Sequence, residues 1–251
     1  MRTLAVLPAR LGATRLPRKP LRLLAGVPLV VRVHQRVAEI GVADRIVVAT
    51  DSDEVAAAVA AHGGDAVLTS DQHPSGTHRV AEVARRPEFA GFDVIVNVQG
   101  DEPFVSARAV IGATRMVTDA GFALGTAAVM APLGILHDPN VVKVVAADDG
   151  RAMYFSRGAI PHLRETVDGE LLRTRVWQHI GLYAYERSAL MQWVELPESP
   201  LEQIERLEQL RPLAAGMAMG VSLIDEAVRP GIDTEQDLER ANREWTVLTT
   251  G

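Results

Sequence analysis

Short apolar segments alternate with amphipathic ones through the first hundred residues, and this alternation restricts the fold more than any other feature. Residues 3–8 and 46–49 are apolar runs without polar alternation, a pattern typical of strands buried on both faces. Residues 29–40 repeat valine at helical spacing, and residues 53–62 are rich in alanine after Ser52, a favourable helix cap. Strands that alternate with helices pair in parallel, so the sequence predicts an α/β fold.

The same order continues and then changes in the second half of the chain. Strands are predicted at residues 66–69 and 94–98, with a helix ending at Arg85 between them. Residues 141–146 and 151–156 flank a hairpin-type turn, which predicts antiparallel pairing and a mixed sheet. The later elements are predicted as a strand at 176–185, one amphipathic helix at 200–213, a strand at 217–224 and a helix at 234–244. We expect a single α/β domain over residues 1–251, with a central, mostly parallel sheet flanked by helices and an antiparallel part.

Composition and charge exclude several classes of protein. A hydrophobic content of 47% argues against disorder, and the absence of cysteine removes disulfides, thiolate zinc sites and cysteine nucleophiles. A formal net charge of −6 argues against a general nucleic-acid-binding protein. No apolar stretch reaches the roughly 20 residues of a membrane helix, and the first residues lack the layout of a secretory signal. We therefore expect a cytoplasmic protein without membrane insertion.

The loop after the first strand carries a concentration of positive charge. Arg10, Arg15, Arg18 and Lys19 lie between two apolar segments, and Gly12 permits close approach of the backbone. Ligands of open α/β sheets bind beyond the carboxyl ends of the strands, so this loop is a candidate polyphosphate site. An ordinary exposed basic loop is the alternative. The motifs Gly-x-x-x-x-Gly-Lys-Ser/Thr and Gly-x-Gly-x-x-Gly do not occur, so neither a P-loop NTPase nor a standard dinucleotide fold is supported.

Two carboxylates, Asp101 and Glu102, follow the strand predicted at residues 94–98, and Gly100 before them permits a sharp turn. Oxygen ligands at a strand end suit Mg²⁺, which binds through one or two carboxylates together with substrate phosphates. Asp233, just before the last predicted helix, is a candidate to complete the site. In each case the alternative is an aspartate that caps a turn or a helix.

Lysine is almost absent from the chain. Only two of the 26 basic residues, Lys19 and Lys143, are lysines, and a compositional bias of the source genome explains most of the arginine excess. A compact ammonium nevertheless differs from a planar guanidinium in how it approaches an oxygen. We expect Lys19 to be functional, whereas Lys143 is a candidate structural residue.

Several segments of the chain together resemble the sugar cytidylyltransferases, and most closely those that act on 3-deoxy-manno-octulosonate (Kdo). The resemblance runs in order from the first strand to Asp233, over nearly the whole chain. The segments that carry it are Pro8-Ala9-Arg10, Thr14-Arg15-Leu16-Pro17, Lys19-Pro20-Leu21, Ile46-Val47-Val48-Ala49-Thr50-Asp51, Ser75-Gly76-Thr77, Val96-Asn97-Val98-Gln99-Gly100-Asp101-Glu102-Pro103, Tyr154-Phe155-Ser156-Arg157, Ser199-Pro200-Leu201-Glu202 and Glu208-Gln209-Leu210-Arg211. Each motif alone is a weak signal, but the ordered set is specific.

The resemblance implies a Rossmann-like nucleotide-diphospho-sugar transferase fold. It also implies an enzyme that transfers CMP from CTP to Kdo for lipopolysaccharide biosynthesis and releases pyrophosphate. The implied cofactor is Mg²⁺, with Asp101 and Asp233 as its ligands. The implied catalytic residues are Arg10, Arg15, Lys19 and Asp101. The implied nucleotide-binding residues are Pro8, Ala9, Arg10, Arg15, Lys19, Thr50, Ser75, Gly76, Arg79 and Asp101.

The implied contacts of the acidic sugar are Gln99, Arg157, His179, Tyr183 and Glu208. Arg157 is the best partner for the sugar carboxylate, because a guanidinium fork binds carboxylates bidentately. His179 is also explained as a buried core imidazole, and Tyr183 as a packing residue. Glutamates at helical spacing, Glu202, Glu205 and Glu208, are consistent with a solvated helix face for at least two of the three.

Two positions depart from the family pattern. His78 follows Ser75-Gly76-Thr77 where an acidic residue is expected, and Leu11-Gly12-Ala13 stands where an aromatic residue and a serine are usual. His73 and His78 lie in one loop without further ligands, so we do not expect a metal site there.

The family is usually dimeric, so we expect a homodimer, with residues 150–187 as a dimerisation and sugar-site region. Two alternatives to the Kdo reaction stay open. One is a cytidylyltransferase for a related acid, such as 8-amino-Kdo or a sialic acid. The other is a non-catalytic nucleotide-binding protein of the same fold.

Overall fold

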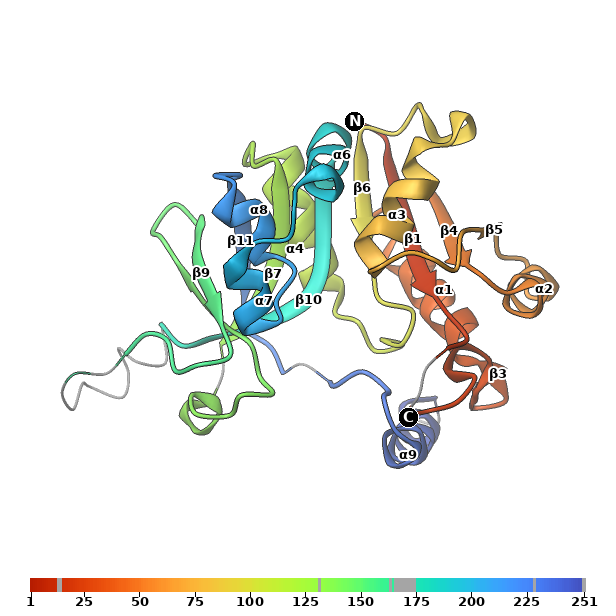
Figure 1. The fold of residues 1–251 in the computed structure, drawn as a ribbon. Coiled ribbons are helices and arrows are strands. Elements are labelled where there is room, and N and C mark those ends of the chain that lie inside the picture. The colour runs from red at the N-terminus through yellow and green to blue at the C-terminus, as the bar shows by residue number, and fades with distance from the viewer. Residues whose placement is uncertain (13–14, 131, 163, 165–174, 228, 250–251) are drawn as a thin grey trace. The chain divides into compact units, whose positions relative to one another are not determined.

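The computed structural model describes residues 1–12, 15–130, 132–162, 164, 175–227 and 229–249 (Figure 1). Its backbone contacts group into two compact units, unit 1 with Met1–Ser106 and Arg229–Gly251 and unit 2 with Ala107–Val228. The single domain over residues 1–251 stays a prediction, because this grouping does not say whether the units fold independently. Thr14 of the basic loop, and residues 163 and 165–174 of the expected dimerisation region, lie outside the described residues.

Unit 1 contains a parallel sheet in the strand order β6-β1-β4-β5. These strands are β1 (Thr3–Ala9), β4 (Arg45–Thr50), β5 (Ala66–Leu68) and β6 (Val94–Asn97), at the four predicted places. Val6 of β1 pairs with Val47 of β4 on one side and with Asn97 of β6 on the other. Because β1 has a strand on each side and is buried over most of its length, its apolar run lacks polar alternation. The loops after β1 and β6 therefore start at the same edge of the sheet.

Three helices of unit 1 lie where the sequence predicts them. They are α1 (Leu29–Ile40), α2 (Asp53–Ala61) and α3 (Gly76–Arg85). Ser52 caps α2, because its hydroxyl accepts a 3.3 Å hydrogen bond from the amide of Val55. Ser75 caps α3 in the same way and so defines how the loop before that helix meets it. Two 3₁₀ turns, Lys19–Leu21 and Pro87–Phe89, and a short hairpin of β2 (Leu23–Leu24) and β3 (Val27–Pro28) complete the first segment of the unit.

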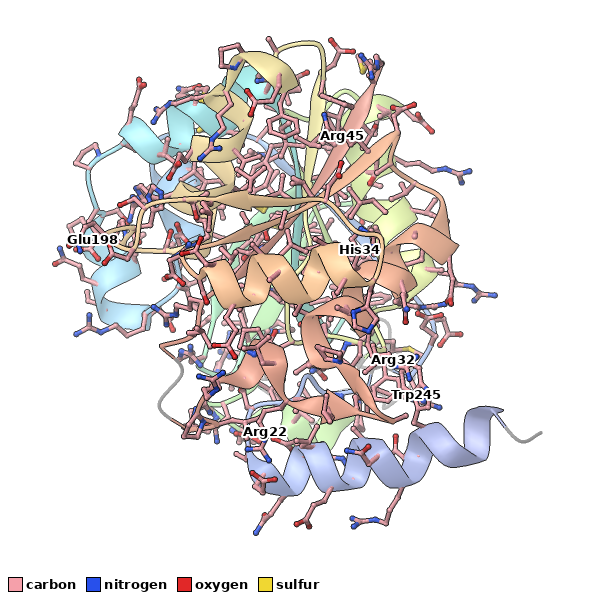
Figure 2. The ribbon with its side chains drawn as sticks, turned by 90° about the vertical axis from the view of Figure 1, so that its right-hand side faces the viewer. Arg22, Arg32, His34, Arg45, Glu198 and Trp245 are labelled. Atoms are coloured by element: carbon pink, nitrogen blue, oxygen red, sulfur yellow. The ribbon has the colours of Figure 1, made fainter. Side chains whose placement is uncertain are left out.

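The last segment of the chain returns to unit 1 and packs on the basic loop. Its helix α9 (Glu235–Thr249) follows Asp233. Ile232, Leu238 and Ala241 of this segment share a buried cluster with Leu16, Leu24 and Leu29. The guanidinium of Arg32 on α1 lies over the ring of Trp245 on α9, 4.6 Å from its centroid (Figure 2). This packing places Asp233 beside residues that are distant from it in sequence.

Unit 2 contains a sheet in the order β11-β7-β10-β8-β9. The strands are β7 (Leu124–Met130), β8 (Lys143–Ala146), β9 (Ala152–Ser156), β10 (Trp177–Glu186) and β11 (Met219–Ile224). The pairing of β7 with β11 is parallel, and β7 with β10, β10 with β8, and β8 with β9 are antiparallel. The prediction of a mixed sheet with an antiparallel part is confirmed.

Helices of unit 2 correct the sequence analysis in two respects. The predicted single helix at residues 200–213 is wrong, because α7 (Pro200–Glu205) and α8 (Leu210–Ala214) are separate. Arg206 adopts a left-handed backbone, φ 54°, and its amide caps α7, which stops that helix. The sequence analysis also missed α4 (Ala107–Thr118), α6 (Arg187–Glu195) and the 3₁₀ turn at Leu133–Ile135, and it missed strand β7. In Figure 1, α4 lies behind β7 and β10, against which it packs.

Among the described helices, none combines the length and the apolar character that crossing a bilayer requires.

Candidate functional site

The loops after β1 and β6 approach each other closely in unit 1. A Cβ atom at Gly100 would lie only 2.8 Å from the carbonyl oxygen of Pro8, so this contact requires glycine. The close approach brings the start of the basic loop beside Gln99 and Asp101. The chain therefore joins a group of cations and a carboxylate at the carboxyl ends of two neighbouring strands.

Lys19 makes ionic contacts with two carboxylates. Its Nζ lies 2.5 Å from Oδ2 of Asp101 and 2.7 Å from Oδ1 of Asp233. Burial lowers the pKa of Lys19, but the two carboxylates and their hydrogen bonds outweigh it and hold the pKa above its ordinary value. Arg15 extends the group, because its Nη2 lies 3.0 Å from Oδ2 of Asp233. The ammonium is thus charged and held at a defined position.

Asp233 reaches this site through main-chain contacts as well as through its side chain. The amide of Ile232 donates a 3.0 Å hydrogen bond to the carbonyl of Asp101. The amides of Asp233 and Thr234 both donate to Oδ2 of Asp237. Thr234 caps α9, because its Oγ1 accepts a hydrogen bond from the amide of Asp237, and the carboxylate of Asp233 is left to face Lys19 and Arg15.

The converging loops enclose a cavity of about 440 Å³ within unit 1. Its lining includes nine of the ten expected nucleotide-binding residues, together with Gln99 and Asp233. Further lining residues that the sequence analysis did not name as site residues are Gly12, Leu16, Pro20, His73, Pro74 and Gly100. His73 and Pro74 could have been found by inspecting the loop after β5 in the same way as the loops after β1 and β6.

Thr50 is the expected nucleotide-binding residue that does not line the cavity. It ends β4, is fully buried, and its hydroxyl accepts a 3.3 Å hydrogen bond from the amide of Ser52. This contact organises the turn into α2.

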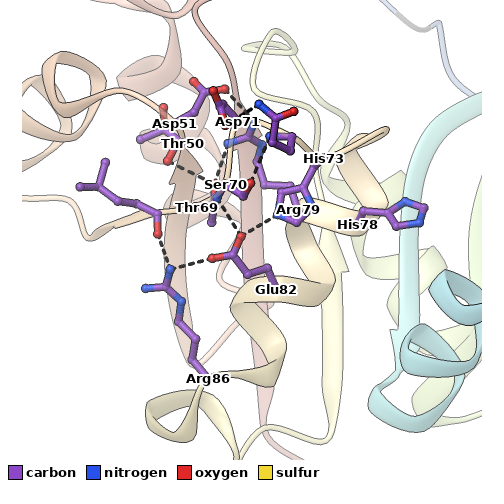
Figure 3. A network of polar contacts seen from close by, with 12 residues as sticks. Thr50, Asp51, Thr69, Ser70, Asp71, His73, His78, Arg79, Glu82 and Arg86 are labelled. Carbon is purple, nitrogen blue, oxygen red and sulfur yellow. Dashed lines mark hydrogen bonds and ion pairs between the residues drawn. The ribbon is translucent and has the colours of Figure 1, made fainter.

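The wall of the cavity at residues 73–76 is fastened by a polar network (Figure 3). Glu82 of α3 accepts hydrogen bonds from His73 Nε2 at 2.6 Å, from the amide of Ser70 at 2.9 Å and from Arg86 at 2.9 Å. Burial would raise the pKa of Glu82, but these donated hydrogen bonds and the charge of His73 lower it to about 2. The carboxylate holds both ends of the loop between β5 and α3.

Arg79 also connects segments of this wall through hydrogen bonds. The guanidinium is almost fully buried and lies 2.8 Å from Asp51 Oδ2 and 2.6 Å from Thr69 Oγ1. It therefore joins the end of β4 to the loop after β5 while it lines the cavity. His78, which departs from the family pattern, turns its Nδ1 to within 2.9 Å of the hydroxyl of Ser75.

The carboxyl group of Glu102 has a raised pKa beside this group of charges. Burial raises the pKa of Glu102 to about 7, and the charges of Asp101 and Asp233 act in the same direction against that of Lys19. The pair Asp101 and Asp233 fits Mg²⁺ by its chemistry, since both are carboxylates and both already bind a cation, the Lys19 ammonium. No group of three metal-ligating side chains converges anywhere in the described ranges of the chain.

Four of the five expected sugar contacts belong to unit 2. Arg157 follows β9, where its amide donates to Glu205 Oε2 at 2.9 Å. Its guanidinium donates only to main-chain oxygens in the described part of the chain, to Glu205 O from Nε at 2.9 Å and to Pro139 O from Nη1 at 3.1 Å. The carboxylate of Glu205 is instead bound by Ser156 Oγ and the Arg157 amide. Among the described residues, the guanidinium of Arg157 is thus oriented by main-chain oxygens and forms no ion pair with a carboxylate.

Lys143 supports the same segment from inside the unit. Its side chain is fully buried, and Nζ donates to the carbonyls of Asp138, Val141 and Arg157 at 2.8, 2.7 and 2.6 Å. Burial lowers the pKa of Lys143, while the charges of Asp138 and Glu205 oppose this effect. These contacts give Lys143 the structural role that the sequence suggested.

His179 and Tyr183 lie on β10 within an aromatic cluster. The His179 ring meets Phe155 edge-on at 4.8 Å between centroids and lies 5.6 Å from the ring of Tyr183. Burial lowers the pKa of His179 to about 3, so the imidazole is neutral at physiological pH. Burial, with the neighbouring Tyr185 and Glu208, raises the pKa of Tyr183 well above its ordinary value.

The glutamates of α7 and the turn after it do not form a solvated face. Glu202 is buried and binds Arg211 through two hydrogen bonds of 2.7 Å, besides forming a capping box with Ser199. Glu205 binds the end of β9, as described above. The expectation of a solvated face is therefore wrong for Glu202 and does not describe Glu205.

Comparisons with known proteins agree on one family. The model of a family described as cytidylyltransferase matches residues 4–219. The 3-deoxy-manno-octulosonate cytidylyltransferase of Gemmatimonas aurantiaca is 61% identical over 248 residues, which cover 99% of this chain and 96% of the relative. The enzyme of the same name from Nitrobacter winogradskyi is 43% identical, over 96% of this chain and 93% of the relative.

Solved structures show the same similarity in three dimensions. The structure of CMP:2-keto-3-deoxy-manno-octonic acid synthetase complexed with CTP matches 99% of this chain and 100% of its own with a TM-score of 0.90 and 35% identity. A 4-diphosphocytidyl-2C-methyl-D-erythritol synthase from Anaerococcus prevotii shares the fold, with a TM-score of 0.61 at 14% identity. The expected nucleotidyltransferase fold is thereby confirmed.

Proposed function

The chain belongs to the 3-deoxy-manno-octulosonate cytidylyltransferase family, and we propose that it catalyses the reaction for which that family is named. It transfers CMP from CTP to Kdo and releases pyrophosphate, in the service of lipopolysaccharide biosynthesis. The observation that carries the proposal is the contact of Lys19 with Asp101 and Asp233, in a cavity that Arg10 and Arg15 also line.

The reaction requires positive charge where the leaving group forms. The anomeric hydroxyl oxygen of Kdo bonds to the α-phosphorus of CTP, and the bond from that phosphorus to the bridging oxygen breaks. Pyrophosphate leaves with its electron pair, and the hydroxyl proton is released. Arg10, Arg15 and Lys19 neutralise the charge that develops on the phosphate oxygens, and Lys19, which Asp101 and Asp233 hold in place, needs no rearrangement during the reaction.

Asp101 and Asp233 hold the cofactor Mg²⁺ in this proposal. An ion held by these two carboxylates would supply Lewis-acid chemistry at the α-phosphate. Lys19 keeps the two carboxylates in position and limits their mutual repulsion. Pro8, Ala9, Ser75, Gly76 and Arg79 form the walls of the nucleotide cavity, and Thr50 supports it from β4.

The acidic sugar is bound by Gln99, Arg157, His179, Tyr183 and Glu208. Arg157 binds the sugar carboxylate, because its guanidinium is oriented by two carbonyls and carries a charge that no described carboxylate pairs with. The remaining four side chains contact sugar hydroxyls.

We also propose that the enzyme is a cytoplasmic homodimer that uses residues 150–187 in dimerisation. The absence of cysteine from the sequence is consistent with a reducing compartment. Sedimentation of the purified protein tests the dimer, which a monomeric species at all concentrations would contradict.

Pyrophosphate release tests the reaction. Wild-type protein is supplied with Mg²⁺, with CTP, UTP or GTP, and with Kdo, 8-amino-Kdo or a sialic acid. We expect release only from CTP and Kdo. Release with another sugar acid but none with Kdo would overturn the substrate and keep the enzyme class.

Asp101→Ala separates the enzyme from a nucleotide-binding protein without activity. We expect turnover to collapse while the circular dichroism spectrum is retained. If the biological function survives this substitution unchanged, the chain does not act by catalysis.

A further inference from the structure

A threonine buried in unit 2 is placed to decide which nitrogen of His179 carries a proton. Thr126 of β7 is fully buried, and its Oγ1 lies 2.9 Å from Nε2 of His179. The same hydroxyl lies 2.7 Å from the carbonyl oxygen of Leu182 and 3.3 Å from that of Ile180. One hydroxyl therefore has three polar neighbours.

The bulge in β10 creates this arrangement. Residues of β10 pair with β7 in regular register up to Ile180, opposite Ala127, and pairing resumes with Tyr183 opposite Thr126. Gly181 and Leu182 are extra residues in β10, so carbonyls here turn away from the regular ladder. The Thr126 hydroxyl lies within hydrogen-bond distance of two carbonyl oxygens at the bulge, those of Ile180 and Leu182.

Counting protons assigns the direction of each hydrogen bond. Carbonyl oxygens only accept, and a threonine hydroxyl has one proton to donate. Oγ1 lies 2.7 Å from the carbonyl oxygen of Leu182. Two oxygens this close repel each other unless a proton lies between them, so the hydroxyl donates its proton to this carbonyl. Oγ1 must then accept from His179, so Nε2 carries the proton of the imidazole. Since the ring is neutral, Nδ1 is unprotonated and is a hydrogen-bond acceptor.

We propose that Thr126 is a positioning residue that holds His179 as the Nε2–H tautomer, so that Nδ1 accepts a hydrogen bond from a hydroxyl of the sugar acid. No described residue forms a hydrogen bond with Nδ1, whereas the ring is held on two sides by Phe155 and Tyr183. The sugar contact rests on the proposed function, but the tautomer of His179 does not. An acceptor nitrogen favours a ligand hydroxyl over a ligand group that only accepts, which gives His179 a part in selecting the substrate.

Long-range proton–nitrogen correlation spectra of protein labelled with ¹⁵N-histidine measure the tautomer directly. The signals of His179 are identified as those missing from His179→Gln. We expect wild-type protein at pH 7 to show a protonated Nε2 and an unprotonated Nδ1. A protonated Nδ1, or an even mixture of the two forms, would overturn the assignment whatever the enzyme's activity is.

Thr126→Val removes the hydroxyl oxygen that accepts the hydrogen bond from His179 Nε2, and Thr126→Ser keeps it. We expect Thr126→Val to lose the single tautomer and to raise KM for Kdo about tenfold, with KM for CTP unchanged, and Thr126→Ser to restore both. If Thr126→Val does not fold, the comparison of Thr126→Ser with wild type and the wild-type spectrum decide the question. Thr114→Val is the matched control, because Thr114 is also buried but donates only to a carbonyl of its own helix, Val110, at 2.8 Å.

Two failures are distinguishable. If Thr126→Val changes the tautomer of His179 but keeps the KM for Kdo of the wild type, the role of Thr126 in sugar binding is overturned and the proposed reaction stays intact. Absence of pyrophosphate release by wild-type protein with CTP and Kdo would overturn the proposed reaction and leave the tautomer as measured.

Discussion

The ammonium of Lys143 donates a 2.6 Å hydrogen bond to the main-chain carbonyl of Arg157. Its other two bonds go to carbonyls of residues 138 and 141, so one buried cation ties the segment before β8 to the end of β9. Arg157 donates in turn to Pro139, within the segment that Lys143 holds. One of the two lysines of the chain therefore orients the arginine that we assign to the sugar carboxylate.

Lys143→Met should weaken both the fold and the binding of Kdo. The substitution leaves three partly buried carbonyls without their donor, and we expect the free energy of unfolding to fall by on the order of 2–4 kcal/mol. KM for Kdo should rise more than KM for CTP, because Arg157 loses a support. Urea unfolding and steady-state kinetics measure the two effects. Arg115→Met is the control, since Arg115 is exposed and its ion pair with Asp119 is long, 3.9 Å. Equal stability of the two variants would contradict the prediction.

Lys19→Arg should lower turnover at least tenfold although it keeps the charge. The ammonium contacts two carboxylates from one point, and a planar guanidinium with its longer fork cannot take the same place without moving them. Pyrophosphate release at saturating CTP and Kdo measures the loss. Arg18→Lys, in the same loop, should leave turnover unchanged, because Arg18 pairs with Glu54 at an exposed position. Full turnover of Lys19→Arg would show that this position needs only a positive charge.

Asp101→Asn should raise the Mg²⁺ concentration needed for activity and lower turnover by about a hundredfold or more. An amide is a weaker ligand for a hard cation than a carboxylate. Removal of Mg²⁺ with EDTA should abolish pyrophosphate release by wild-type protein, and added Mg²⁺ should restore it. Asp148→Asn is a suitable control, since that side chain is 95% exposed. Activity that persists in EDTA would contradict the assignment of Mg²⁺.

Glu82 should stabilise the protein at neutral pH and lose this effect in acid. The pKa of Glu82 is lowered to about 2 in the folded chain from an ordinary 4.5. The carboxylate therefore contributes fully above pH 4.5, and its contribution is lost as pH falls from 4.5 through 2. We expect the free energy of unfolding of Glu82→Gln to be about 2–3 kcal/mol lower than that of wild type at pH 7. This difference in stability should be smaller at pH 3. Glu39→Gln, at an exposed helix position, is the control. An equal difference in stability at both pH values would mean that the charge of Glu82 is not the cause of that difference.

The sequence predicts unit 1 well, because each of its signals is local. The apolar run of β1 and the serine cap at Ser52 act over a few residues, and both lie where predicted. The basic loop could be recognised as a candidate site from its position after a strand. Contacts between distant segments leave a weaker signal in the sequence: Asp233 could be named as a candidate to complete the carboxylate site, but its contact with Lys19 could not be predicted from spacing.

Three features of unit 2 could not be predicted from local sequence patterns. The spacing of apolar residues from 200 to 213 is helical, yet the left-handed backbone of Arg206 breaks the helix, and no periodicity reports a single backbone angle. Glu202 looks like a surface residue by its type, but Arg211 satisfies it inside the fold. Lys143 could not be recognised as a link between segments, since the oxygens that it binds belong to the main chain and leave no trace in the residue types.

The contact of Lys19 with Asp233 joins positions 214 residues apart, and this separation sets an order of events during synthesis. A ribosome makes all of unit 2 before Asp233 and Ile232 emerge. Until then Leu16, Leu24 and Leu29 lack the buried partners that residues 232–241 provide, and Lys19 has Asp101 alone. The nascent chain therefore completes the surroundings of Lys19 last, and a message cut short after β11 would encode the strands of both sheets but only one of the two carboxylates.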